Sequence, residues 1–386
     1  MLTASQQRVN LPDERLWTFS PAAALFHAVG SEAKSLTMLN EAKGSTEISG
    51  NVIDYPARDM TITVGAALMI GQLRDVLMQE NQQLPIDSAD DTMAIGDLVA
   101  FDVSGPRQYG YGTLRDYLIG IEASDGNGRV FHAGGRVVKN VAGYDLCRML
   151  IGAHGRLGTL RQLTFKLKPL PVEQHLSVAA FRSLQDLDSA LERLNLSSTT
   201  PQILDVLNPP AAAKMQPAMD ASLASGTSSA FQAFLVLGFE GSRKACDWQT
   251  KTLAEELHGT AISVTSVARP EVTTMYCRAA TQFSANHFAK HTGWSAKVVT
   301  LPSRVVSVLQ IAREFGLMAC GRAGNGIVFL DADAAVNLGT VREKLTHLVE
   351  GSSGHVEIQE LNKTWRHPVM TPPVERYSGM LHELLG

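Results

Sequence analysis

Alternating apolar and polar residues mark the first clear strand of the chain, at residues 59–65, where every second position is apolar. A helix is predicted next, because apolar residues recur at helical spacing from Ile70 to Leu77. Pro85 is expected to end this helix, since proline cannot continue the helical hydrogen-bond ladder.

Two further segments in the same half have strand character. Residues 163–168 alternate large apolar side chains with Thr and Lys, which indicates a strand with one buried face. Residues 119–122 and 129–132 flank Asp125-Gly126-Asn127-Gly128, a strong signal for a hairpin turn. Because these elements do not repeat as strand–helix–strand units, we expect an α+β domain of mixed sheet and not a Rossmann fold.

The pattern changes after Lys168-Pro169-Leu170-Pro171-Val172, where two prolines predict an extended connection. We therefore expect one domain over residues 1–172 and a second over residues 173–386. In the second domain, apolar runs and amphipathic helices predict an α+β cap, an antiparallel sheet with helices on one face. Residues 209–229, rich in Ala, Ser, Pro and Met, are expected to form a loop.

Composition restricts the class of protein. Of 386 residues, 45% are hydrophobic and 19% charged, which is typical of a globular protein with two domains. The net charge is −4 without a Lys/Arg block, so nucleic acid is not expected as a partner. Four separated cysteines without a CxxC pair argue against an iron–sulfur site on this chain. Because neither a signal peptide nor an apolar run of about 18 residues is found, we expect a cytoplasmic protein without a membrane span, in which partners provide any peripheral contact with the inner membrane.

Glycines are concentrated between Gly134 and Leu160, around the pair Tyr144-Asp145. Without a Cβ atom, a glycine lets backbone amides approach a ligand closely, and a Gly-rich turn before a helix suits a pyrophosphate. The first interpretation of this segment is therefore a nucleotide-sized ligand laid over the end of a sheet.

Three motifs in this half occur in a telling order: SGPR at residues 104–107, YGTLRD at 111–116 and KNVAGYDL at 139–146. Together they resemble the flavoproteins grouped with vanillyl-alcohol oxidase and the glycolate and D-lactate dehydrogenases. The combination is most similar to the FAD-binding E subunits of bacterial glycolate oxidases. The resemblance implies a two-subdomain PCMH-type FAD-binding domain followed by the cap. Because no His, Cys or Tyr aimed at the flavin ring can be identified, we expect non-covalent FAD.

The resemblance also implies which residues contact FAD, through an N-terminal pyrophosphate loop, a second flavin loop and the Gly-rich segment. It assigns no catalytic residue and no metal ligand. The implied cofactor-binding residues are Gly30, Ser31, Lys34, Pro85, Ile95, Gly96, Ser104, Gly105, Gly112, Asp116, Asn140, Gly143, Tyr144, Gly158 and Leu160.

Two of these loops depart from the family pattern. Asp97 stands where relatives carry the second glycine of a pair, and its charge would repel a phosphate unless the side chain turns away. The N-terminal loop, residues 30–34, carries Glu32 and Ala33 against the pattern. A phosphate loop and a plain surface turn are equally open hypotheses there.

The histidines that bind a divalent metal in catalytic relatives are missing. The matching segment runs from Arg322 to Phe329, and these two residues occupy the histidine places. Arginine offers no lone pair to a metal at physiological pH. We interpret His154 as structural, and the pair His287 and His291 as part of a solvated helix face.

These features predict the FAD-binding subunit of a glycolate (2-hydroxy acid) oxidase or dehydrogenase, inactive alone. The oxidation site would lie on a catalytic partner subunit with its own FAD, and an iron–sulfur subunit would take the electrons onward. Two alternatives stay open: a structural subunit that has lost FAD, and a stand-alone FAD oxidoreductase acting on another substrate.

Overall fold

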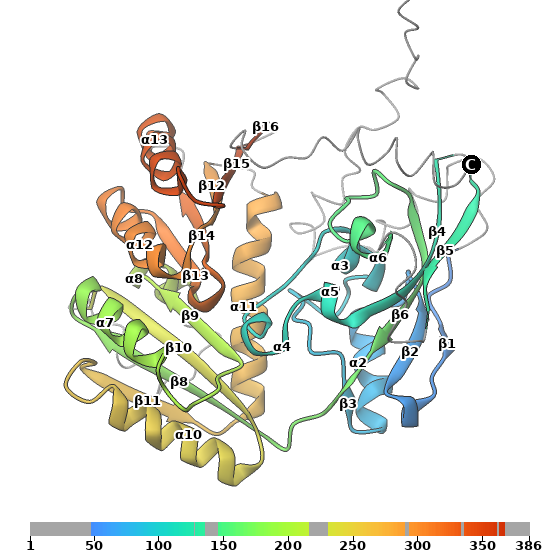
Figure 1. Ribbon diagram of the computed structural model, residues 1–386, viewed down its shortest axis with the longest axis horizontal. Coiled ribbons are helices and arrows are strands. Elements are labelled where there is room, and N and C mark those ends of the chain that lie inside the picture. The colour runs from blue at the N-terminus through green and yellow to red at the C-terminus, as the bar shows by residue number, and fades with distance from the viewer. Residues whose placement is uncertain are drawn as a thin grey trace, which may run out of the picture.

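The computed structural model describes residues 48–126, 128–135, 146–215, 231–289, 293–332, 336–360 and 363–366. Two antiparallel sheets organise these residues: a five-stranded sheet built from residues 52–166 and a nine-stranded sheet built from residues 173–366 (Figure 1). Helices pack on each sheet, so the expected α+β class is confirmed. The described strands of the first sheet are all antiparallel, so the expectation of a mixed sheet there is wrong. We call the two parts the first domain and the cap.

The five-stranded sheet is the framework of the first domain. In spatial order its strands are β1 (Val52–Asp54), β2 (Thr61–Gly65), β6 (Thr159–Lys166), β4 (Leu118–Ser124) and β5 (Val130–Gly134). The strands and the hairpin expected from the sequence are confirmed. The apolar side chains of their inner faces, such as Ile62 and Phe165, are fully buried. They form one core with helices α2 (Ile70–Gln79), α3 (Ile95–Ala100) and α6 (Leu146–Leu150).

Helix α2 ends at Gln79, earlier than Pro85 led us to expect. Asn81 has a φ angle of 53°, in the left-handed region that asparagine tolerates better than most residues. The chain therefore turns there and enters the short strand β3 (Gln82–Gln83), and Pro85 lies buried in the loop beyond it.

The connection to the cap is fastened to the first domain. Strand β7 (Lys168–Pro169) pairs antiparallel with β3, and the amide of Leu170 donates to the carbonyl of Asn81 at 2.8 Å. The two prolines give an extended chain, as expected. As far as Leu170, this chain is hydrogen-bonded to the first domain.

The nine-stranded sheet forms the cap, and all its neighbouring strands are antiparallel. Its central strands are apolar on both sides, as in β10, where eight of nine residues are buried. In spatial order the strands are β11 (Ser263–Val267), β8 (Glu173–Phe181), β10 (Ala233–Gly241), β9 (Ile203–Leu207), β13 (Met318–Arg322), β14 (Ile327–Ala332), β12 (Trp294–Val299), β15 (His355–Glu360) and β16 (Lys363–Arg366).

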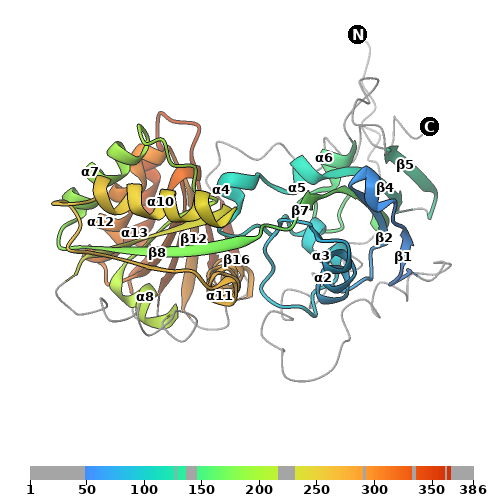
Figure 2. The ribbon, with the colours of Figure 1, turned by 90° about the horizontal axis from the view of Figure 1, so that it is seen from below.

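Helices cover both faces of this sheet (Figure 2). Helices α7 (Leu184–Leu194), α10 (Arg243–Glu256), α12 (Val305–Glu314) and α13 (Leu338–Val349) lie on one face. Helices α8 (Pro209–Met215) and α11 (Pro270–Ala289) lie on the other, so the expectation of helices on one face only is wrong.

In the cap, helix α8 was not anticipated from the sequence, and α11 was anticipated only at its C-terminal end, where His287 lies. The first part of the segment expected as a loop, residues 209–215, is α8, because Asn208 Oδ1 accepts the amide of Ala211 at 3.2 Å and proline suits a first helical turn. Helix α11 buries a narrow stripe that is interrupted by Thr, Ser and Arg, which hides its period. The stripe consists of Val272, Tyr276, Ala280 and Phe283.

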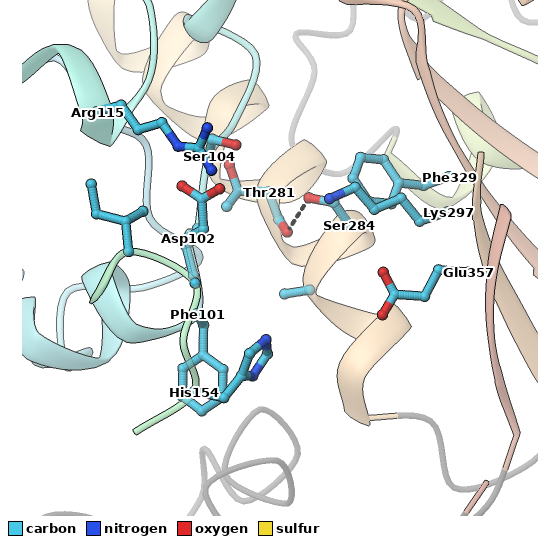
Figure 3. A pocket seen from close by; sticks show the side chains of 14 residues that line it. Phe101, Asp102, Ser104, Arg115, His154, Thr281, Ser284, Lys297, Phe329 and Glu357 are labelled. Carbon is cyan, nitrogen blue, oxygen red and sulfur yellow. Dashed lines mark hydrogen bonds between the residues drawn. The ribbon is translucent and has the colours of Figure 1, made fainter. Parts of the chain in front are cut away.

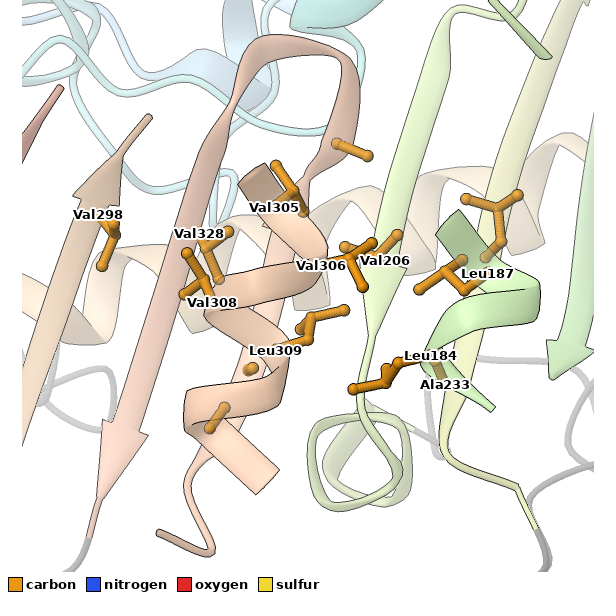
Figure 4. Close-up of a cluster of buried hydrophobic side chains, with 14 of the residues drawn as sticks. Leu184, Leu187, Val206, Ala233, Val298, Val305, Val306, Val308, Leu309 and Val328 are labelled. Carbon is orange, nitrogen blue, oxygen red and sulfur yellow. The ribbon is translucent and has the colours of Figure 1, made fainter. Parts of the chain in front are cut away.

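We predict that Leu309→Ala lowers the free energy of unfolding by about 2–5 kcal/mol, because Leu309 is 1% exposed within the aliphatic cluster between α12, α7 and the sheet (Figure 4). Leu196→Ala is the matched control, since Leu196 is 90% exposed and should change the same quantity by less than about 0.5 kcal/mol. Urea unfolding followed by circular dichroism measures both. Equal effects of the two substitutions would contradict this packing.

Candidate functional site

A cavity of about 220 Å³ lies between the first domain and the cap (Figure 3). The first domain contributes residues 101–104, directly after α3, together with Arg115 and residues 151–154. The cap contributes the middle of α11 and one residue from each of three neighbouring strands. The cavity therefore belongs to neither domain alone.

Two strained residues shape the wall of the first domain. Asp102 and His154 have φ angles of 50° and 54°, in the left-handed region that side chains rarely adopt. The loop of His154 is tied to the end of α3, because His154 N donates to the carbonyl of Ala100 at 2.9 Å. The His154 ring meets the ring of Phe101 edge-on, with centroids 5.1 Å apart. The surrounding structure thus holds both residues at the cavity in spite of their strained backbone conformation.

Next to them, Ser104 and Gly105 offer unused backbone donors. Within the described residues their amides make no hydrogen bond, whereas the amides of Asp102 and Val103 donate to carbonyls of α3. Ser104 lines the cavity. Its hydroxyl group also has no hydrogen-bond partner among the described residues. Free N–H and O–H groups at a cavity suit a ligand with carbonyl or phosphate oxygens.

The cap wall carries a row of three side chains in register. Lys297 on β12 is the direct cross-strand partner of Phe329 on β14 and of Glu357 on β15. On α11, Thr281 and Ser284 donate their hydroxyl hydrogens to carbonyls of their own helix, so their oxygens are left as acceptors. The cap thus presents an ammonium group, a carboxylate, hydroxyl oxygens and an aromatic face to one space.

The cavity offers both hydrogen-bond donors and acceptors to a polar ligand. Donors come from Arg115 and Lys297, acceptors from Asp102 and Glu357, and the Oδ1 atom of Asp102 is buried without a hydrogen-bond partner. Binding pockets for drug-sized ligands usually enclose roughly 300–1,000 Å³. A cavity of about 220 Å³ suits a small acid or the polar end of a larger ligand.

Of the residues implied by the sequence motifs, Ser104 lines the cavity and Gly105 adjoins it. Six others lie outside the described residues, so their roles stay predictions. These six are Gly30, Ser31, Lys34, Asn140, Gly143 and Tyr144.

The amides of Ile95 and Gly96 are occupied within the protein, and the contact of these two residues with FAD stays a prediction. Ile95 N donates to the carbonyl of Leu68 at 2.9 Å, and Gly96 N donates to the carbonyl of Ala66 at 2.8 Å. A Cβ atom on Gly96 would lie 2.9 Å from that carbonyl oxygen. The glycine is therefore required for close packing of α3 against the end of β2, which a sequence motif alone does not distinguish from ligand approach.

Four further residues lie in local structure of the first domain. Asp116 accepts the amide of Thr113 at 2.8 Å and so caps helix α5 (Leu114–Tyr117), and Gly112, with φ of 92°, leaves room for that carboxylate. Gly158 has φ of 152° beside the carbonyl of Ser124, and Leu160 is 8% exposed in β6. Their contact with FAD stays a prediction.

Sequence analysis missed the cap wall and most of the first-domain wall. A usable signal was Lys297, a charged residue inside an otherwise apolar strand whose neighbours Ala296 and Val298 are fully buried. No sequence pattern predicts the strand pairing that brings Glu357 beside Lys297, because the two residues are sixty positions apart in the chain.

Asp97 lies in the first turn of α3 and does not line the cavity. Burial raises the pKa of its carboxyl group to about 6, and the described residues provide no hydrogen bond to it. A carboxyl group in this state is protonated well above the pH at which an exposed one would ionise. Around neutral pH, Asp97 is therefore a destabilising residue of the first domain.

Arg322 and Phe329, which occupy the expected histidine places, belong to the cap core. Arg322 Nη1 donates to Asp205 Oδ2 at 2.8 Å, Nη2 donates to the carbonyl of Ala280 at 3.0 Å, and Phe329 lies 5.9 Å from the guanidinium. Burial is the largest influence on the pKa of Asp205 and raises it to about 6, although Arg322 opposes this. Among the described residues, no group of three His, Cys, Asp or Glu side chains could hold a metal ion.

Comparisons with known proteins agree with this arrangement. Residues 37–134 match the family described as FAD binding domain. Glycolate oxidase subunit GlcE of Escherichia coli is 31% identical over 147 residues, which cover 38% of this chain and 42% of that protein. Part of this chain, residues 37–134, is therefore similar to a FAD binding domain.

Other relatives of this chain include D-lactate dehydrogenase of Archaeoglobus fulgidus, 28% identical over 35% of this chain and 30% of that protein. Glycolate oxidase subunit GlcD of Bacillus subtilis is 28% identical over 41% and 34% of the two chains. The matches thus span less than half the length of these curated relatives.

The whole fold also has a solved counterpart. Alkyldihydroxyacetonephosphate synthase superimposes with a TM-score of 0.61 at 16% identity, covering 87% of this chain and 64% of the other. At this identity the likeness concerns the fold alone. Across the described ranges, none of the helices combines the length and the apolar composition that a membrane span requires.

We predict that Asp97→Asn stabilises the protein at pH 7–8 by on the order of 2 kcal/mol, and that this gain shrinks as the pH falls. The folded pKa of about 6 exceeds the unfolded value, so the native state binds more protons and loses stability as pH rises from about 4 through 6. Urea unfolding of both proteins between pH 4 and 8 measures the difference. Asp75→Asn, on the exposed side of α2, is the matched control. A difference that does not vary with pH would contradict this assignment.

Proposed function

We propose that this chain is the FAD-binding subunit of an oxidase or dehydrogenase of 2-hydroxy acids such as glycolate. The observation that carries the proposal is the match of residues 37–134 to the FAD binding domain family, because Ser104-Gly105 within this range has amides that are unused among the described residues, next to an interdomain cavity. Relatives named as glycolate oxidase subunits and D-lactate dehydrogenases support the substrate class.

The residues at the cavity fit the polar edge of a flavin. The amides of Ser104 and Gly105 and the side chain of Arg115 would hold its oxygen atoms, and Thr281 and Ser284 would accept from its N–H group. Bound FAD accepts a hydride, while the protein supplies position and electrostatics. The N-terminal loop at residues 30–34 and the segment at residues 140–144 would complete the site.

The oxidation of the hydroxy acid is assigned to a partner. At the two places of the expected histidines, Arg322 forms a buried ion pair with Asp205, and the Phe329 ring lies against its guanidinium group. Neither side chain can bind a metal ion, so this chain offers no metal ligand at those two places. A catalytic subunit with its own FAD and an iron–sulfur subunit would complete the complex. The names of two relatives as subunits of glycolate oxidase support a multi-subunit assembly.

Two other functions have specific support. The occupied amides of Ile95 and Gly96 and the charge of Asp97 favour a structural subunit that has lost FAD. His154, Lys297 and Glu357 at one cavity favour a stand-alone FAD oxidoreductase of another substrate, because they could move a proton and bind an acid. Turnover of 2-hydroxy acids by the purified chain with a dye acceptor tests the latter.

We expect the purified chain, after incubation with FAD, to show flavin absorption bands and about one FAD per chain. Acid precipitation should release all of the flavin into the supernatant, since the attachment is proposed to be non-covalent. Yellow colour in the pellet would contradict that attachment. A colourless protein that takes up no FAD would instead identify the structural subunit.

We further expect Ser104→Tyr to weaken FAD binding by at least about 10-fold, because a phenol ring would fill the cavity and displace the unused amides. Ser263→Tyr, on the exposed edge strand β11, is the matched control and should bind as tightly as the wild type. Titration of FAD fluorescence measures both affinities. Unchanged binding by Ser104→Tyr would remove this cavity from the FAD site.

A further inference from the structure

A short segment of the first domain is inserted into the cap. Helix α4 (Gln108–Tyr111) follows the SGPR motif, and the Tyr109 ring covers Gly324, where a Cβ atom would collide with it. Gly110 N donates to the carbonyl of Gln202 at 3.1 Å. The end of the flavin-loop motif is therefore fixed by contacts with cap strands and not by the first domain alone.

Arg107 lies at the start of this insertion and binds carboxylates of both domains. Its Nε donates to Asp87 Oδ1 at 2.8 Å, and its backbone amide donates to Asp87 Oδ2 at 2.9 Å. Its Nη1 lies 3.6 Å from Glu240 Oε1 on cap strand β10. The Asp87 and Glu240 side chains are 2% and 0% exposed, so both depend on this one guanidinium for compensation of their charge.

Glu240 has few other partners. Tyr111 Oη donates to Glu240 Oε2 at 2.6 Å, whereas the buried Glu240 Oε1 accepts no hydrogen bond from the described residues. Burial raises the pKa of Glu240, while Arg107 and Tyr111 oppose that rise. Loss of one charge in this cluster would leave the other buried charges without a partner, which is strongly unfavourable.

The same cluster holds the unused amides of the cavity in place. Gly105 is enclosed between the Asp87 side chain and the hydroxyl of Thr281 on α11, and a Cβ atom there would collide with both. Ser104 and Gly105 are thus fixed from one side by the carboxylate that binds Arg107, and from the other side by the cap helix. Their position depends on where Glu240 and α11 sit.

We propose that Arg107 is a positioning residue for the cofactor: by joining Asp87 to Glu240 it aligns the Ser104 and Gly105 amides, so that FAD affinity of the first domain depends on the cap. This inference rests on the proposed FAD-binding function. Arg107 acts through Asp87 and the backbone, because it is absent from the cavity lining and its charge is directed at two carboxylates.

The test compares FAD affinity of the wild type with Glu240→Gln, a cap substitution outside the cavity. We expect Glu240→Gln and Arg107→Lys to raise the Kd for FAD by about 10- to 100-fold, as changes behind a binding group commonly do. Arg243→Gln removes an exposed ion pair with Glu173 in the same cap and should leave the Kd within about twofold.

Hydrogen exchange of the peptide spanning residues 103–108, measured without FAD, separates positioning from general loss of stability. Faster exchange in that peptide of Glu240→Gln, with unchanged exchange in the core strands β2 and β6, is the expected result. If the wild type binds FAD and Glu240→Gln matches it in both affinity and exchange, the inference is wrong and the proposed function stands. If the wild type itself binds no FAD, the proposed function fails and the inference fails with it.

Discussion

Compensation of buried charge at the domain interface is the constraint on which the arrangement of this molecule depends. A carboxylate shielded from water is tolerated only beside a cation, and Asp87 and Glu240 share Arg107 for that purpose. Since the two carboxylates belong to different domains, the interface and the segment after Ser104 have to form together. By contrast, Arg278 of the cap pairs with Asp91 of the first domain near solvent, where an ion pair contributes little.

The fold could be predicted from the sequence wherever one face of an element is apolar and the other polar. That is why β2, β6 and the hairpin around Asp125 were found. The prediction failed where polar residues interrupt the apolar stripe of a helix, or where a helix depends on a residue far away in the sequence. Helix α11 presents Thr and Ser along most of its length, and α8 depends on the side chain of Asn208, which is anchored by Ala319 more than a hundred residues later. Distant partners of that kind leave no mark in a short window of sequence.

The candidate site was predictable in part, for a different reason. A glycine motif records that two backbones approach closely, but it does not record what approaches. At Gly96 the neighbour is the carbonyl of Ala66, whereas the amides of Ser104 and Gly105 have no partner among the described residues and lie next to a cavity. The cap side of that cavity consists of single residues on separate strands, Lys297 and Glu357 among them, and only the pairing of β12 with β15 brings them together.

The glycines of the segment from Arg322 to Phe329 have a consequence for how such chains are classified. Gly324 is needed because a tyrosine ring of the other domain lies on it, and Gly326, with φ of 68°, is needed for the turn into β14. Neither requirement involves a metal ion. A chain of this fold can therefore keep the glycine spacing of a metal-binding segment after its ligands are gone, for reasons of assembly alone. Searches that score this spacing would count such chains as metalloenzymes, and the residues at its two ends are the ones that discriminate.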